Sequence, residues 1–454
     1  MLSHSPPFPL IIYYPGKRST TMSEEDKHGA KVALQQRERV HRVHIAAPAS
    51  NLRDLVQVMN DEYPNLKRLL IRAQAEPRAD RRNRNHNRNR NDAVTVTLHE
   101  GLRAPLLHRV TLSNVGLPTS SCLLSGAGED LVSLGLLNFP AEPPDFHPAH
   151  LTAQLAALSH LELLTVHFST AVPNHQVMRQ LQGAPTTRIA LPRLRMLAYR
   201  GGSAYLEGIL ARLDAPHLHT LSVEFFNQLT FSIPSLLHFA RAMNALTFRS
   251  AALYFDEDFA SLIVDPLDKR AGDGGGGGTH PLHVQVKGKL LDWQVTSMSQ
   301  ICSTLAPLLA QTENLMLGFH KDGPDPAAAG AVEAEAPGAA AGWQVAVDRA
   351  QWRALFRIFV GVKTLQLSGG RIGDLFRALQ LRVGEGNGGG EGEGADEEGT
   401  NDDGVDGGVF TPEILPALQK LLPRGWGDPD DAFASFIAAR TAAGLPVRLV
   451  RSRS

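Results

Sequence analysis

The stretch Ala215-Pro-His-Leu-His-Thr-Leu-Ser-Val223 decides how this chain folds, because its apolar residues follow a fixed spacing. They stand at Leu218, Leu221 and Val223, a step of three residues followed by a step of two. The same triplet recurs at Val40/Val43/Ile45, Leu66/Leu69/Ile71, Leu107/Val110/Leu112, Leu131/Leu134/Leu136, Leu161/Leu164/Val166, Leu194/Leu197/Tyr199, Met243/Leu246/Phe248 and Val362/Leu365/Leu367. Such recurrence predicts an array of similar units, each of which adds one strand to a shared core.

This triplet is the L-x-x-L-x-L signature of leucine-rich repeats. Between Val94 and Phe255 successive triplets begin about 24 to 33 residues apart, so the array is irregular compared with the usual repeat length. Helical patterns fill the intervals, for example Leu52, Leu55 and Val56 on one face. We therefore predict an α/β fold, an irregular leucine-rich-repeat solenoid with a curved parallel sheet and helices on its outer side.

The ends of the chain are expected to differ from the array. Residues 1–39 form an N-terminal arm, in which the apolar run Phe8–Tyr14 predicts a buried strand and Ala30–Arg37 a helix. Residues 40–451 form the solenoid, closed by a C-terminal cap with Phe433, Phe436 and Ile437 on one helix face. Such caps protect the apolar ends that stacked repeats would otherwise expose.

Low-complexity stretches interrupt the pattern and predict long disordered insertions, at residues 75–92, 269–280, 322–342 and 384–408. The first alternates arginine with asparagine. It is either a tolerated insertion or a basic segment of the kind that serves as a nuclear localisation signal or touches nucleic acid. The last has acidic residues and many glycines but no basic residue, which is typical of a solvated spacer.

Composition narrows the classes of function. The 45 basic and 46 acidic side chains nearly cancel, so overall charge gives no reason to expect binding to nucleic acid or an anionic membrane. No apolar run reaches the roughly 18 residues needed to span a bilayer. Only two cysteines are present, and no Asn-x-Ser/Thr sequon occurs, which favours a reducing compartment and a cytoplasmic or nuclear protein.

The sequence contains no recognisable catalytic, cofactor or metal site. The close histidine pairs lack further ligands at zinc spacing, and no phosphate-binding glycine loop or G-x-S-x-G element appears. Cys122 and Cys302 are expected to be small core residues. We therefore predict that the protein is not an enzyme and uses no cofactor.

Strand residues that face away from the core remain as candidates for binding. In repeat arrays the extended strand face commonly carries the binding surface. The predicted protein-binding face comprises Arg109, Thr111, Ser133, Thr165, His167, Met196, Thr220, Ser222, Thr364 and Gln366. Such a mixture of hydroxyl, basic and polar groups suits a protein ligand, and it is equally typical of any solvated strand face.

Several segments of the chain together indicate a protein family. They are Val40-His-Arg-Val-His-Ile-Ala-Ala-Pro48, Leu191-Pro-Arg-Leu-Arg-Met-Leu197 with Tyr205-Leu206, Asp214-Ala-Pro-His-Leu-His-Thr-Leu-Ser-Val223 with Phe225-Phe226-Asn227, Leu291-Asp-Trp-Gln-Val-Thr-Ser-Met-Ser-Gln-Ile-Cys302, and Ala432-Phe-Ala-Ser-Phe-Ile-Ala-Ala-Arg440 before Pro446-Val447. In these segments, and over most of its length apart from the low-complexity insertions, the chain resembles the F-box/leucine-rich-repeat proteins of mushroom-forming fungi.

In that family an F-box precedes the repeats and docks onto the adaptor subunit of an SCF ubiquitin ligase, while the repeats hold the substrate. The resemblance implies a non-catalytic recognition module with a protein substrate as its partner. No Leu-Pro-x-Glu opening typical of an F-box occurs here, so the SCF adaptor subunit is an expected partner only if an F-box lies upstream. The alternative is an F-box-less leucine-rich-repeat scaffold without a link to ubiquitination.

Overall fold

The computed structural model describes most of the chain between its low-complexity segments. These are residues 8–16, 22–74, 96–118, 120–127, 130–139, 148–169, 188–226, 228, 230–243, 248–265, 281–319, 347–369, 375–376, 379, 414–424 and 431–450. All four predicted insertions, 75–92, 269–280, 322–342 and 384–408, lie outside these described residues.

The fold is α/β, with a large and mostly parallel sheet of fifteen strands. The strand order is β1-β2-β3-β5-β7-β8-β10-β12-β15-β14-β13-β16-β17-β18-β19. Two compact units divide the chain, and each is described by itself. Unit 1 comprises Met1–Leu246 with Gly275–Gln285, and unit 2 comprises Thr247–Gly274 with Val286–Ser454.

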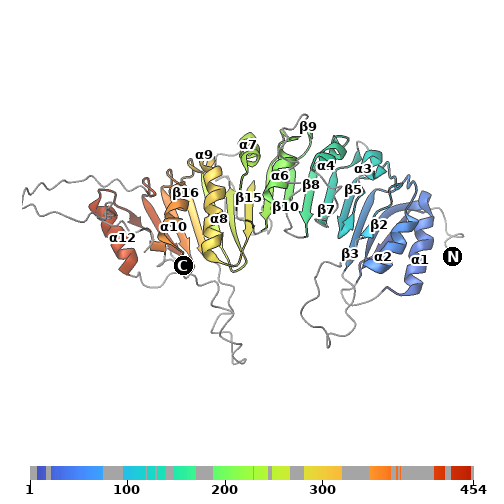
Figure 1. Ribbon diagram of the computed structural model, residues 1–454, viewed down its shortest axis with the longest axis horizontal. Coiled ribbons are helices and arrows are strands. Elements are labelled where there is room, and N and C mark those ends of the chain that lie inside the picture. Colours follow the sequence, from blue (N-terminus) through green and yellow to red (C-terminus); the bar gives the residue numbers. More distant parts are fainter. Residues whose placement is uncertain are drawn as a thin grey trace, which may run out of the picture. The chain divides into compact units, whose positions relative to one another are not determined.

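In unit 1 eight strands pair in parallel in chain order, and the helices gather on one side of them (Figure 1). The strands are β1 (Leu10–Tyr14), β2 (Val40–Pro48), β3 (Arg68–Gln74), β5 (Arg109–Ser113), β7 (Ser133–Phe139), β8 (Leu163–Phe168), β10 (Met196–Gly201) and β12 (Thr220–Phe225). The helices are α1 (Glu24–Gln35), α2 (Ala49–Val58), α3 (Cys122–Ala127), α4 (Pro148–Leu155), α6 (Ser203–Leu210) and α7 (Pro234–Ala242). Parallel neighbours need such a crossover segment between them.

Two small sheets flank these strands in unit 1. One pairs β4 (Val96–Thr97) with β6 (Val115–Gly116), and the other pairs β9 (Ile189–Ala190) with β11 (Leu213–Asp214).

All the predicted apolar triplets but one are buried, as the sequence predicts. The exception is Met243/Leu246/Phe248, because Leu246 lies outside the described residues and the strand there begins only at Ser250. Leu218, Leu221 and Val223 are all buried, and the last two lie in β12. Strand pairing aligns the middle residues of the triplets in one continuous buried row, Val43, Leu69, Val110, Leu134, Leu164, Leu197 and Leu221. Within this row each residue lies beside the equivalent residues of the neighbouring strands, so the core is shared by all these strands.

The N-terminal segment is built into unit 1. Its strand β1 is the edge strand of the sheet and only half-buried, with Ile12 inside and Tyr13 64% exposed, whereas the sequence predicted a buried strand. An edge strand has a neighbour on one side only, which explains the exposure. Helix α1 begins before the predicted Ala30, at Glu24, because the Ser23 hydroxyl accepts the Asp26 amide at 3.0 Å and caps it.

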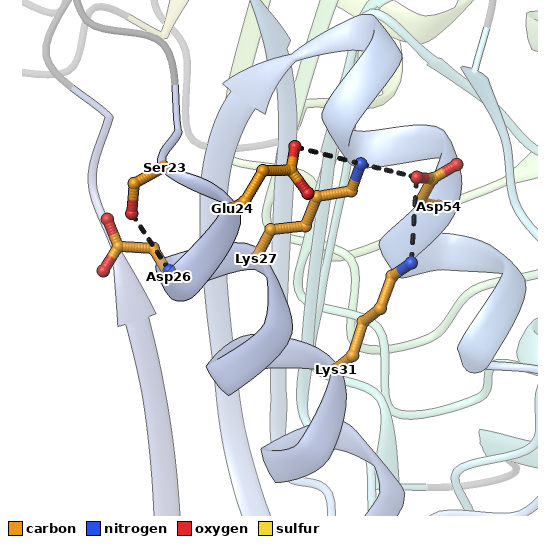
Figure 2. Close-up of polar contacts among 6 residues, drawn as sticks. All are labelled: Ser23, Glu24, Asp26, Lys27, Lys31 and Asp54. Carbon is orange, nitrogen blue, oxygen red and sulfur yellow. Dashed lines mark hydrogen bonds and ion pairs between the residues drawn. The ribbon is translucent and has the colours of Figure 1, made fainter.

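Helix α1 docks onto α2 through one carboxylate. Lys27 Nζ lies 2.6 Å from Asp54 Oδ2, and Lys31 Nζ lies 3.7 Å from the same oxygen, as Figure 2 shows. Lys27 also lies 3.9 Å from Glu24. The lysines come from successive turns of α1, so both reach Asp54 from the same helix face.

Unit 2 contains a hairpin that the sequence did not predict. Strands β13 (Ser250–Phe255) and β14 (Phe259–Asp265) pair antiparallel, whereas a wholly parallel sheet was expected. The connection of three residues is too short for a crossover, and the Asp256 amide closes it on the Phe259 carbonyl at 2.8 Å. Strand β13 then pairs in parallel with β16 (Asn314–Phe319) on its other side.

The rest of unit 2 returns to the strand-and-helix pattern. The remaining strands are β17 (Thr364–Ser368), β18 (Lys420–Arg424) and β19 (Arg448–Leu449), with β15 (Leu282–Lys287) divided between the units. Helix α8 (Leu291–Thr304) packs beside α10 (Arg349–Phe356) (Figure 1). The short helix α9 (Ala306–Leu309) comes between them in the chain, and α12 (Asp431–Ala442) is near the C-terminal end.

The predicted C-terminal cap helix is present as α12. Phe433 and Phe436 are buried against Phe376, while Ile437 is partly exposed. Arg440 is buried as well, and its guanidinium donates to the carbonyls of Ile414 and Leu418 at 3.3 and 3.4 Å. Burial lowers the pKa of this arginine from its usual value.

Candidate binding face

The strands of unit 1 have one face against the helices and one face without them, which we call the open face. Side chains alternate along a strand, so the residues between the buried ones point to the open face. The burial pattern of β12, half-buried at Thr220 and Ser222 and buried at Leu221 and Val223, shows this alternation. Strand register then decides which open-face residues of different strands lie side by side.

Eight of the ten predicted binding residues lie on this open face in three rows. The first row contains Arg109, Ser133, Met196 and Thr220, with Leu163 between Ser133 and Met196. The second contains Thr111, Thr165 and Ser222, separated by Gly135 and Ala198. The eighth residue, His167, lies in a third row. The structure thus brings together side chains that are up to about a hundred residues apart in the chain.

The third row is a charged cluster at the end of strands β8, β10 and β12. His167 is in register with Arg200, which is in register with Glu224. Arg200 Nε lies 3.2 Å from Glu224 Oε1, and the guanidinium also lies over the Phe226 ring, 5.6 Å from its centre. Desolvation and the charge of Arg200 lower the pKa of His167, while Glu224 opposes this effect. The arrangement presents a neutral imidazole beside a paired arginine, which suits polar recognition.

Sequence reasoning missed three arginines of the open face. Arg42 on β2 and Arg68 on β3 continue the first row from Arg109, and Arg72 lies four residues after Arg68 on the same strand. All four arginines are exposed. The available signal was the alternation of polar and apolar residues in the first two strands, which marks these positions as outward.

The other two predicted residues, Thr364 and Gln366, belong to unit 2, where they line a shallow hollow of about 360 Å³. Gln366 Nε2 donates to the sulfur of Met316 at 3.1 Å, and Asn314, Ser250 and Leu422 are among the other lining residues. The hollow is lined by strand residues of β13, β14, β16, β17 and β18. It offers amide, hydroxyl and thioether groups, which bind by hydrogen bonds and contact area.

Gly318 on β16 allows a close contact between β16 and the neighbouring strand β13. A Cβ atom on Gly318 would lie 2.7 Å from the ring of Tyr254, so the tyrosine ring packs directly against the backbone of β16. The Tyr254 hydroxyl in turn approaches the sulfur of Met316 at 3.8 Å. The absence of a side chain at Gly318 therefore leaves room for the Tyr254 ring against the backbone of β16.

Metal binding and thiol reactivity depend on how the described His, Cys, Asp and Glu side chains are placed. Across the described ranges, no three His, Cys, Asp or Glu side chains gather closely enough to hold a metal ion. Burial raises the pKa of the Cys302 thiol far above its usual value, which disfavours the reactive thiolate. Cys122 lies partly exposed at the start of α3. The described side chains support binding by shape, hydrogen bonds and charge.

No helix in the part of the chain that the structure describes is both long enough and apolar enough to cross a membrane. Comparison with known proteins gives no match, either to a protein-family model or to a curated protein.

Proposed function

We propose that the chain is a non-catalytic protein-recognition module that binds its partner across the open face of unit 1. In this proposal the sheet and its helices are an irregular leucine-rich-repeat solenoid, and the module is the substrate-binding half of an SCF-type ubiquitin-ligase adaptor. The proposal that the partner is a protein substrate comes from the resemblance of the sequence to F-box/leucine-rich-repeat proteins.

The observation that carries the binding role is the arrangement of the open face. Parallel strands in register place rows of half-buried and exposed side chains side by side, and the helices cover only the opposite face. Arginine, methionine and hydroxyl side chains mix on it, as is common where one protein surface meets another. A rigid backbone beneath the face presents these groups with little ordering cost on binding.

Site-specific photo-crosslinking tests this role. We would place a photoreactive phenylalanine analogue at Thr165 or Thr220 on the open face, and at the exposed His238 on α7 as the matched control. The tagged chain would be expressed from its own gene. We expect the same partner protein to be crosslinked from both open-face positions and not from His238. Crosslinks from His238 alone, or none from either open-face position, would refute the proposal.

The crosslinked partner also separates the two readings of the function. For a ligase adaptor, the SCF adaptor subunit co-purifies with the chain, and the partner accumulates when the gene is deleted. For the alternative, an F-box-less leucine-rich-repeat scaffold, the same partner is crosslinked but its half-life does not change on deletion.

A further inference from the structure

The arginine patch, Arg42, Arg68, Arg72 and Arg109, concentrates positive charge at one part of the open face. Arg42, Arg68 and Arg109 are in register on the adjacent strands β2, β3 and β5. Neighbouring strands lie about 4.8 Å apart, so these like charges are direct neighbours. Like charges placed opposite each other in a sheet are destabilising, and an anionic ligand would relieve that repulsion.

Within the described part of the chain, none of these four arginines forms an ion pair. Two carboxylates near this end of unit 1 pair with other cations: Asp54 with the lysines of α1, and Asp61 with Arg37. The residues on either side of Arg42, Arg68 and Arg109 along the first row are neutral, with Ile11 of β1 next to Arg42 and Ser133 of β7 next to Arg109. The patch therefore presents uncompensated charge to a ligand.

A neutral and partly apolar line runs between the charged positions. It consists of Tyr13, His44, Leu70 and Thr111, which are in register on β1, β2, β3 and β5. The rings of Tyr13 and His44 pack edge to face, with centres 4.8 Å apart. Desolvation and the charge of Arg72 lower the pKa of His44, so this imidazole stays neutral at neutral pH.

Spacing along β3 indicates the kind of chain that fits. Arg68, Leu70 and Arg72 occupy alternate positions, so their side chains leave the open face about 6.6 Å apart. An extended peptide has the same repeat, because its alternate side chains also point to one side. A segment with a carboxylate, an apolar residue and a second carboxylate at alternate positions matches the sequence of charges on β3.

We propose that the arginine patch binds an extended acidic segment of the partner protein, with carboxylates at alternate positions around an apolar residue. This deepens the proposed function and rests on it. Single-stranded nucleic acid is the less suitable ligand, because it binds through stacking platforms as well as charge, and here the two rings pack against each other. The near-zero net charge of the chain also provides little general attraction for a polyanion.

Fluorescence anisotropy with the full chain tests the proposal. The probe is a fluorescein-labelled peptide with two copies of Glu-Ser-Leu-Ser-Glu, compared with the same peptide carrying lysine in place of glutamate and with a 12-nucleotide single-stranded DNA. We expect the glutamate peptide alone to bind, and we expect its binding to weaken as salt rises. No binding of the glutamate peptide, or binding of the DNA alone, would overturn the proposal.

Matched variants locate the site. The triple change Arg42→Ser, Arg68→Ser and Arg109→Ser is expected to weaken binding about tenfold or more, since several charge-assisted contacts are lost together. The control removes the same charge at exposed arginines outside the patch, Arg188→Ser, Arg193→Ser and Arg241→Ser, and should change the affinity less than about twofold. Equal losses in the two triple variants would overturn the proposal.

Charge reversal gives a gain of function that a misfolded variant cannot produce. The change of Arg42, Arg68 and Arg109 to glutamate should abolish binding of the glutamate peptide and create binding of the lysine peptide.

The failure of this proposal is distinguishable from the failure of the proposed function. If the glutamate peptide fails to bind the unchanged chain while the crosslinks from Thr165 and Thr220 persist, the acidic ligand is wrong and the recognition role stands. If the peptide binds but those crosslinks are absent, the recognition role fails separately.

Discussion

Gly201 at the end of β10 offers a stringent test of how tightly unit 1 is packed. A Cβ atom on this residue would lie 2.4 Å from the Tyr199 hydroxyl and 2.8 Å from a ring carbon of Phe168. The Tyr199 hydroxyl donates to the Gly202 carbonyl at 2.8 Å, so it cannot move away without losing that hydrogen bond. The Gly201→Ala change therefore forces a rearrangement inside the core.

The expected cost follows from these contacts. Overpacking of a core costs about 1–3 kcal/mol. Loss of the hydroxyl's hydrogen bond adds roughly 1 kcal/mol, so Gly201→Ala should lower the free energy of unfolding by about 2–4 kcal/mol in total. A glycine in a strand without such a close approach would behave in the opposite way, because alanine usually stabilises such a position by about 0.5–1 kcal/mol. The sign of the change is therefore diagnostic.

Urea denaturation followed by far-ultraviolet circular dichroism measures the effect, with Tyr199→Phe and the double variant completing the cycle. Tyr199→Phe alone should cost about 1 kcal/mol, because it removes only the hydroxyl. With the hydroxyl gone, the closest contact of the new methyl group is relieved, so the double variant should cost at least about 0.5 kcal/mol less than the sum of the single changes. Stabilisation by Gly201→Ala, or an additive cycle, would refute the reasoning.

Three further predictions concern unit 1. Leu221→Ala should lower the free energy of unfolding, measured by urea denaturation, by about 3–5 kcal/mol. Thr220→Ala beside it should change that free energy by no more than about 0.5 kcal/mol. Equal losses in the two variants would contradict the alternation of buried and open positions. Glu207 accepts the first amides of α7 at 2.7 and 3.0 Å, and Glu207→Ala should cost about 1–3 kcal/mol. Because burial raises the pKa of Glu207 above its usual 4.5, this group's stability contribution should decline as pH rises through 4.5 and then through the raised folded value, and Glu207→Gln should abolish that decline. The pKa of Asp54 is lowered, chiefly by its bond to Lys27, so its contribution should be present above pH 3.8 and lost as pH falls through the lower folded value; Asp54→Asn should remove this acid dependence in thermal melts, and the difference should shrink at high salt.

The local sequence of one strand predicts which of its residues lie on the open face. The alternation around Leu221 and Val223 correctly placed Thr220 and Ser222 outside the core, because successive side chains of a strand point to opposite faces. The same rule applies to Arg42 and Arg68, yet their importance depends on Arg109 lying beside them. That neighbour relation is long-range, and a one-residue change of register would send every side chain of a strand to the other face.

The hollow of unit 2 was beyond sequence reasoning for a related reason. Its lining residues come from five strands, and two of these strands form the antiparallel hairpin that places Ile263 beside Ala252. The direction of their pairing was decided by the three-residue connection and by the partner that β13 finds in β16.

By itself, the sequence determined most strand positions of unit 1 and the buried face of those strands, because the spacing of Leu218, Leu221 and Val223 and its repetitions is local. It also marked the helices between the strands through their own apolar periodicity. Only the tertiary structure decided strand order and register, and with them the arginine patch, the Arg200–Glu224 pair and the half-exposed edge strand β1. Those features depend on hydrogen-bonded pairing between segments far apart in the chain, and that pairing leaves no periodic signal within either segment.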